Sequence, residues 1–169
     1  MAQATTTHLR KAAHVPALIA AVLGTLLLGF LSGALSGSMH GYGDYVVPPL
    51  TPPDMVFPIV WGVLYFMIGL SLFFIVRRSA VTLQLESDRK IATVLWIIQL
   101  VFNLAWPFAF FTLELYTFSM IWLAALVAIN LALIIYAFRV SPVAGGLLIP
   151  YEAWLMFALY LNIFIAILN

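Results

Sequence analysis

The sequence has 169 residues, of which 65% are hydrophobic and only 8% carry a formal charge, as seven Lys or Arg and six Asp or Glu. Soluble domains carry roughly 25% charged residues, so this chain lacks the polar side chains that cover a soluble fold. This excludes a typical cytosolic enzyme, and the net charge of +1 provides no basic face for nucleic acid. The absence of cysteine excludes disulfides and thiolate sites. A polytopic membrane protein remains.

Five long uncharged or nearly uncharged stretches lie between the charges. A bilayer span needs about 20 apolar residues, and each stretch is long enough. The apolar runs are continuous rather than alternating, which indicates helices and not strands. The sequence therefore predicts an all-α membrane protein, a single domain over residues 1–169 that forms a five-transmembrane-helix bundle. The predicted helices are 14–36, 55–77, 91–113, 117–138 and 142–168.

The first stretch has an alternative interpretation as a cleaved signal peptide, because Arg10 and Lys11 precede its apolar run. The run is long for a signal peptide and is rich in Gly and Ser beyond Phe30. We therefore favour a retained span.

Basic residues tend to stay on the inner side of a membrane. With five spans, every Lys and Arg falls on one side, which predicts the N-terminus inside and the C-terminus outside. These residues are Arg10, Lys11, Arg77, Arg78, Arg89, Lys90 and Arg139. The opposite side carries only Asp44, Asp54 and Glu114.

The outer loop 37–54 reads GSMHGYGDYVVPPLTPPD and contains four prolines, which leave it little potential to form a helix. Functional residues are often carried by long loops on a rigid scaffold, so this loop is the first functional candidate.

Small residues recur every fourth position along the first predicted helix, and they share one face. Such a stripe allows two helices to approach closely, either within one chain or in a dimer, and both interpretations stay open. The stripe consists of Ala17, Ala21, Thr25, Gly29, Gly33 and Gly37.

Aromatic and amide side chains share faces on three predicted helices. The spacing suits an apolar pocket with a few orienting polar groups, although Gln99 and Asn103 could equally hydrogen-bond between helices. In the third helix, Pro107 also frees the carbonyl of Asn103 from its helical bond. The residues are Phe57, Trp61 and Tyr65; Trp96, Gln99, Asn103, Trp106 and Phe110; and Tyr151, Trp154, Ala158 and Asn162.

Glu152 is the only acid inside a predicted span, which makes it a functional hypothesis by default. It is either neutral and hydrogen-bonded to a neighbouring helix, or ionised in a wet inner vestibule near Arg139. One carboxylate cannot form a two-acid catalytic pair, so we favour a structural or gating role.

The three histidines, His8, His14 and His40, lie outside the middle of any span, so none is placed to ligate a haem iron inside the bundle. The sequence has no HExxH, GxSxG or phosphate-loop motif. We expect no metal site, no catalytic residue and no required cofactor.

Three segments together resemble the translocator protein family, also called TspO or tryptophan-rich sensory protein, which includes the mitochondrial peripheral benzodiazepine receptor. The resemblance covers residues 18–169, in the order and spacing of the family. The segments are PPLTPPDMVFPIVWGVLYFMIG, WIIQLVFNLAWPFAFF and LLIPYEAWLMFALYLNIFIAILN.

The resemblance implies a five-helix bundle, often a homodimer, with a ligand pocket roofed by the first loop. Family members bind protoporphyrin IX, haem and isoquinoline-like small molecules, and some bind cholesterol. The resemblance assigns the pocket to Tyr42, Trp61, Tyr65, Asn103, Trp106, Trp154, Ala158 and Asn162. Flat aromatic faces suit a flat tetrapyrrole.

The chain departs from the family pattern in the loop, where Val47 and Leu50 replace the usual Lys and Trp. The change weakens the expectation of propionate contacts and of ring stacking there. No basic residue follows Tyr160, so we expect no sterol site of the motif type.

The leading hypothesis is a membrane receptor, sensor or carrier that binds a porphyrin-like or other flat apolar ligand, with lipids around it. Its location would be a bacterial inner membrane or, alternatively, the mitochondrial outer membrane. The alternatives are a photo-oxidative enzyme that degrades porphyrin, and a secondary transporter that uses Glu152. Whether the chain is an enzyme stays open, with binding favoured.

Overall fold

The computed structural model describes residues 2–40, 42, 45–79 and 81–169, and the side chains from residue 15 onward within these ranges except that of residue 40. Asp44 and the side chains of Arg10, Lys11, His8, His14 and His40 lie outside the described part, as do the predictions that rest on them.

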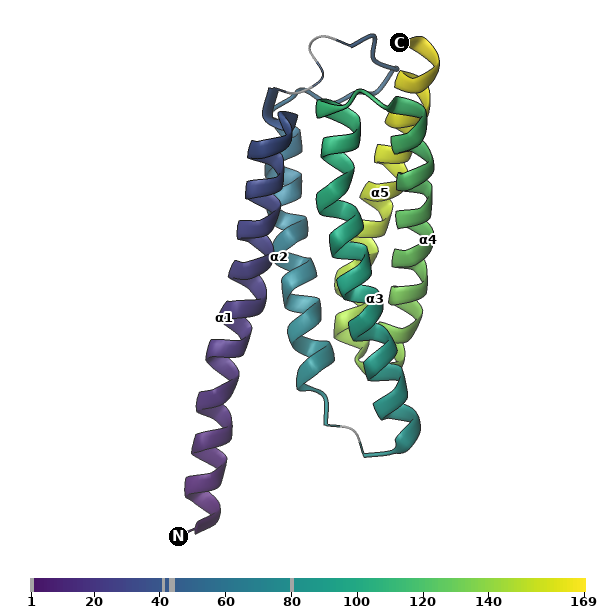
Figure 1. The fold of residues 1–169 in the computed structure, drawn as a ribbon. Helices are drawn as coiled ribbons and strands as arrows, with labels where there is room; N and C mark the ends of the chain where they lie inside the picture. Colours follow the sequence, from purple (N-terminus) through teal and green to yellow (C-terminus); the bar gives the residue numbers. More distant parts are fainter. Residues whose placement is uncertain (1, 41, 43–44, 80) are drawn as a thin grey trace.

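The described residues form five long α-helices, each long and apolar enough to cross a membrane, and this confirms the predicted fold class. They are α1 (Ala2–Ser36), α2 (Val56–Arg77), α3 (Leu83–Pro107), α4 (Tyr116–Val140) and α5 (Pro142–Leu168). Two short helical turns, η1 (Ser38–His40) and η2 (Phe108–Thr112), lie at the end that carries the long loop. Helix α1 packs along α2, α2 along α5, α5 along α4, and α4 along α3, which closes an up-and-down bundle (Figure 1).

Two helices begin earlier than predicted. Helix α3 begins at Leu83 rather than 91, because the Thr82 side chain accepts a hydrogen bond from the Leu85 N–H at 3.1 Å and caps the helix there. Helix α1 begins at Ala2 rather than 14. The charges in both segments mark the edge of the apolar span but do not end the helix.

Pro107 does not break α3. The chain continues from it into η2, a wider π-helical turn in which the Leu113 N–H donates to the Phe108 carbonyl at 2.9 Å. The wider turn accommodates an extra residue, and it places Phe110 and Phe111 against Tyr42 of the loop.

The small-residue stripe of α1 packs within the chain at Gly29, where an added Cβ would overlap the Tyr65 ring of α2. On α2, Gly69 allows the reverse approach, since a Cβ there would lie 2.7 Å from the Ala21 carbonyl oxygen. Gly33 faces the Ser38 side chain, and Gly37 lies just after α1 with a φ of +80°, which favours glycine. Gly29 therefore packs helices together inside one chain, whereas Gly37 ends the helix.

Candidate ligand site

A hydrogen-bonded chain of three buried side chains joins α2, α3 and α5 in the core. The Tyr65 hydroxyl donates to Asn103 Oδ1 at 2.6 Å, and Asn103 Nδ2 donates to the Tyr151 hydroxyl at 2.9 Å. Each of the three residues is at most 7% exposed. In lipid, such interhelical bonds fix which helix faces meet.

A second polar junction lies closer to the loop and joins α3, α4 and α5. Trp106 Nε1 donates to the Ser119 carbonyl at 3.0 Å and to Asn162 Oδ1 at 3.3 Å. Asn162 Nδ2 in turn donates to the Tyr116 carbonyl at 3.2 Å near the start of α4. The two junctions bring together four residues of the predicted pocket, Tyr65, Asn103, Trp106 and Asn162. Their side chains already form hydrogen bonds within the protein.

Two further tryptophans of the predicted pocket flank this core. Trp61 stacks on the Tyr65 ring with centroids 5.4 Å apart and meets the edge of Tyr151 at 6.4 Å. Trp154 meets Phe57 edge to face at 5.8 Å. The Trp154 indole nitrogen is buried and has no hydrogen-bond acceptor among the described residues. This N–H group is therefore free to donate a hydrogen bond to an acceptor on a bound molecule.

The loop closes the outer end of the core through Tyr42. Its ring lies 5.0 Å from Phe57, 5.9 Å from Phe110 and 5.5 Å from Phe111, measured between centroids. The Tyr42 N–H donates to Asp54 Oδ1 at 3.1 Å. Burial, with smaller contributions from Tyr45 and Asp54, raises the pKa of the Tyr42 phenol well above its usual range, so the phenol stays neutral.

The end of the chain holds the loop in place. Asn169 Oδ1 accepts from the Val46 N–H at 3.0 Å, and its Nδ2 donates to the Val46 carbonyl at 3.1 Å. The Tyr160 hydroxyl donates to the Pro49 carbonyl at 2.8 Å. Sequence reasoning missed Asn169 and the contact of Tyr160, because both act on backbone atoms more than one hundred residues away.

Open space adjoins the predicted pocket on its bilayer side. A groove of about 480 Å³ runs between α2 and α5, and Trp154 is the one predicted residue that lines it. Its other walls are almost entirely apolar and include Val60, Leu64, Met67, Pro150 and Ala153. The rings of the predicted pocket, by contrast, are in close contact: Trp61 stacks on Tyr65, and Tyr42, Trp106 and Trp154 pack on phenylalanine rings. Ala158 packs against the same core cluster.

The two remaining polar candidates are Gln99 and Glu152. Gln99 is fully buried, and neither atom of its amide has a hydrogen-bond partner among the described residues. Glu152 accepts a hydrogen bond from Asn130 Nδ2 on α4 at 2.8 Å. This contact corresponds to the interhelical alternative for Glu152, and Arg139 instead lies 3.8 Å from Asp88.

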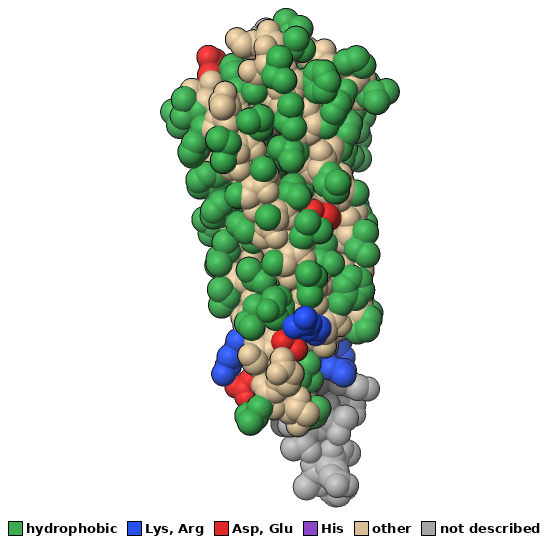
Figure 2. All heavy atoms as spheres, turned by 90° about the vertical axis from the view of Figure 1, so that its right-hand side faces the viewer, with side chains coloured by type: hydrophobic (Ala, Val, Ile, Leu, Met, Phe, Trp, Pro, Cys, Tyr) green, Lys and Arg blue, Asp and Glu red, His purple; other side chains and the backbone are tan. Residues whose placement is uncertain are grey.

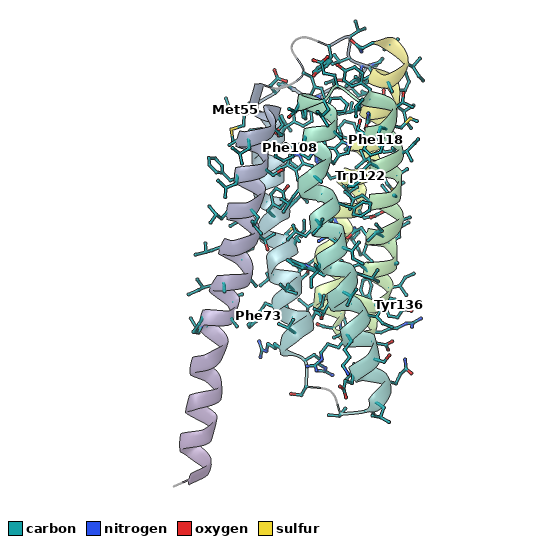
Figure 3. The ribbon with its side chains drawn as sticks, viewed as in Figure 1. Met55, Phe73, Phe108, Phe118, Trp122 and Tyr136 are labelled. Atoms are coloured by element: carbon teal, nitrogen blue, oxygen red, sulfur yellow. The ribbon has the colours of Figure 1, made fainter. Side chains whose placement is uncertain are left out.

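Trp122 differs from the tryptophans of the core. It stacks on Phe102 at 4.4 Å, packs against Phe118 at 5.6 Å, and donates its indole N–H to the Phe102 carbonyl at 2.9 Å. Figure 3 places Trp122 and Phe118 on α4, towards the end of the bundle that carries the loop. Trp122 therefore packs against Phe102 and Phe118 rather than against the rings around Tyr42 and Trp154.

Together, the five apolar helices and the aromatic and amide core define an integral membrane protein of the polytopic α-helical class. Comparison with known proteins identifies the group within that class. The family model of the TspO/MBR family matches residues 20–168, and the chain belongs to this family.

Individual relatives come from distant organisms. The chain is 36% identical over 133 residues to the tryptophan-rich protein TspO of Chlorobaculum tepidum, which covers 76% of this chain and 78% of the relative. It is 32% identical over 124 residues to the translocator protein of Sus scrofa, covering 73% and 72%. It is 29% identical over 154 residues to the TspO protein of Archaeoglobus fulgidus, covering 90% and 96%.

Proposed function

We propose that the chain is a membrane receptor, sensor or carrier that binds a flat apolar ligand of the tetrapyrrole class. The site would lie beneath the loop, between α2, α3 and α5. The observation that carries the proposal is the position of Trp154, which contacts the aromatic cluster under the loop on one side and lines the bilayer groove on the other.

The chemistry of these residues supports such a ligand. Indole and phenol faces stack on a flat conjugated ring, and the free indole N–H of Trp154 offers one donor to a polar edge of the ligand. The groove volume falls within the range of roughly 300–1,000 Å³ that is typical of small-molecule sites. A tetrapyrrole would have to displace Tyr42 and Phe57 from their present contacts, so loop movement would accompany binding.

Tryptophan fluorescence provides the test. Protoporphyrin IX added to the protein in detergent micelles should quench the emission saturably. Trp61→Ala and Trp154→Ala should each weaken binding by about tenfold, which corresponds to about 1.4 kcal/mol. Trp122→Ala is the matched control and should bind as the wild type does. Trp122 packs on Phe102, whereas Trp61 and Trp154 pack on Tyr65 and Phe57 beside the proposed site. Quenching that never saturates would contradict the proposal, and so would equal losses in all three variants.

The side chains of the loop indicate how the ligand would be bound. Val47 and Leu50 are exposed, and Asp54 is the nearest described charge in the segment that leads to α2. Among the described residues of the loop, no cation is therefore positioned to bind a propionate. We expect protoporphyrin IX dimethyl ester to bind at least as tightly as the free acid. Much weaker binding of the ester would instead indicate a cationic contact elsewhere.

We also propose that the N-terminus lies inside and the C-terminus outside, in a bacterial inner membrane. The described Lys and Arg side chains lie at the end of the bundle opposite the loop, as the face in Figure 2 illustrates. Cysteine introduced at Leu50 should react with an impermeant thiol reagent on intact cells, and cysteine at Val81 should not. The chain has no native cysteine to interfere.

A homodimer is proposed as the assembly, as the family resemblance implies. The Gly29 face of α1 is occupied by Tyr65 of the same chain, so the dimer would have to use another face. Cross-linking in native membranes, followed by mass measurement in detergent, would test the stoichiometry.

A further inference from the structure

The pair formed by Glu152 and Asn130 lies in the middle of the bundle. Glu152 is about 15 Å along α5 from Pro142, at the rise of an α-helix, and so is far from either end of its span. Glu152 is 6% exposed and Asn130 is fully buried. Figure 2 shows acidic side-chain atoms at mid-height, with hydrophobic side chains around them.

The hydrogen bonds of this pair do not balance if the carboxyl group is ionised. Asn130 Nδ2 donates to Glu152 Oε2 at 2.8 Å. The other acceptor of each group, Glu152 Oε1 and Asn130 Oδ1, is buried and has no donor among the described residues. Two buried acceptors without donors, one of them charged, would cost free energy in an apolar span.

A protonated carboxyl group removes both deficits at once. A hydrogen on Oε1 gives that atom a donor function, and the acceptor it needs is the free Oδ1 of the same amide. A carboxylic acid and a primary amide are planar groups with complementary edges, so they can form two reciprocal hydrogen bonds. One proton thus satisfies both atoms that are left over.

No described cation offers an alternative partner. On α4, Arg139 lies about 13 Å along the axis from Asn130, and its guanidinium contacts Asp88 and the Tyr136 ring. On α2, Arg77 lies over the Phe73 ring. Helix α5 contains no Lys, Arg or His.

The other titratable groups near the pair are phenols. Tyr151 precedes Glu152 in the chain, and its hydroxyl accepts from Asn103, while Tyr65 on α2 donates to the same Asn103. On α3, Glu86 pairs with Lys90, and the Arg89 side chain donates to the Arg78 carbonyl. None of these groups supplies Glu152 with a counter-charge.

From this geometry we propose that Glu152 and Asn130 form a proton-binding site within the membrane, at which one bound proton clasps α4 to α5 through a cyclic acid–amide pair. Loss of the proton opens the clasp, because the carboxylate repels the Asn130 carbonyl oxygen that it otherwise binds. The site does not require the ligand proposed above, and binding of that ligand neither supports nor contradicts it.

Infrared spectroscopy of the purified protein in lipid tests the protonation state directly. At neutral pH the wild type should show the C=O stretching band of a protonated carboxylic acid, and Glu152→Gln should lose it. Glu114→Gln is the matched control, since Glu114 is exposed in the segment between η2 and α4, and should keep the band. Absence of the band in the wild type, or its persistence in Glu152→Gln, would overturn the proposal.

Stability against pH gives a second, independent measurement. A glutamine at 152 can form the same two hydrogen bonds with Asn130 without a proton, so Glu152→Gln should fold as the wild type does. Between about pH 4.3, where an exposed glutamate titrates, and the pH at which the clasp opens, the wild-type Tm should fall as the pH rises, because the folded state keeps a proton that the unfolded chain has released. The Tm of Glu152→Gln should not show this fall, and equal pH dependence in both proteins would contradict the clasp.

Discussion

Asn103 and Gln99 lie one turn apart on the same face of α3, and both are buried amides with at most 3% exposure. Asn103 is hydrogen-bonded to Tyr65 and Tyr151, whereas Gln99 has no partner among the described residues. Asn103 therefore belongs to a satisfied network that joins three helices. Gln99 and the Glu152–Asn130 pair, close to this network, hold polar atoms that have no partner among the described residues.

The contrast separates two uses of a polar side chain in lipid. A satisfied network fixes the rotation of each helix about its axis, because only one rotation brings its donors and acceptors together. An unpaired buried group costs free energy, and such a group in a native structure points to a proton, water or ligand. The same amide-to-leucine substitution should therefore have opposite effects at Asn103 and at Gln99.

Asn103→Leu should have the largest effect. It removes two hydrogen bonds and leaves the hydroxyls of Tyr65 and Tyr151 buried together without their shared partner. We expect the free energy of unfolding to fall by about 2 kcal/mol. Unfolding in mixed micelles of a mild detergent and dodecyl sulfate measures it. A loss below a few tenths of a kcal/mol would show that the network does not stabilise the bundle.

Gln99→Leu makes the same amide-to-alkyl change one turn away and should act in the opposite direction. Leucine leaves no donor or acceptor unpaired and roughly keeps the volume, so the free energy of unfolding should stay constant or rise by about 1 kcal/mol. The same micelle assay applies. Destabilisation equal to that of Asn103→Leu would mean that Gln99 has a partner, such as an ordered water, and the contrast would then disappear.

Tyr160→Phe should have the smallest effect on global stability, about 0.5 kcal/mol, because it removes one partly exposed hydrogen bond to the Pro49 carbonyl. Its effect should be local. Amide hydrogen exchange in the loop segment 45–51 should become faster, while exchange in the middle of α3 stays unchanged. Tyr136→Phe is the matched control, because Tyr136 lies at the end of the bundle far from the loop.

The helix faces were more predictable than the helix ends. Spacing of three and four residues correctly grouped Trp96, Gln99, Asn103 and Trp106, all of which are buried. The predicted start of α3 was wrong. Charged residues mark where the apolar span ends, whereas the helix begins where its backbone finds a cap, here at Thr82. The π-helical turn after Pro107 was not predicted either, since nothing local distinguishes it from a break.

The sparse charge of this sequence determined its class and its five spans. Its motifs determined its membership of the TspO/MBR family. Side-chain periodicity determined which residues face inward, because helix geometry is local. Only the tertiary structure decided the partners: Tyr151 for Asn103, Asn130 for Glu152, and Asn169 for the loop. These pairs come from different elements, and their meeting depends on how each helix is rotated and aligned against its neighbours. In helices this uniformly apolar, the polar contacts that set the rotation can be read only after the helices are packed.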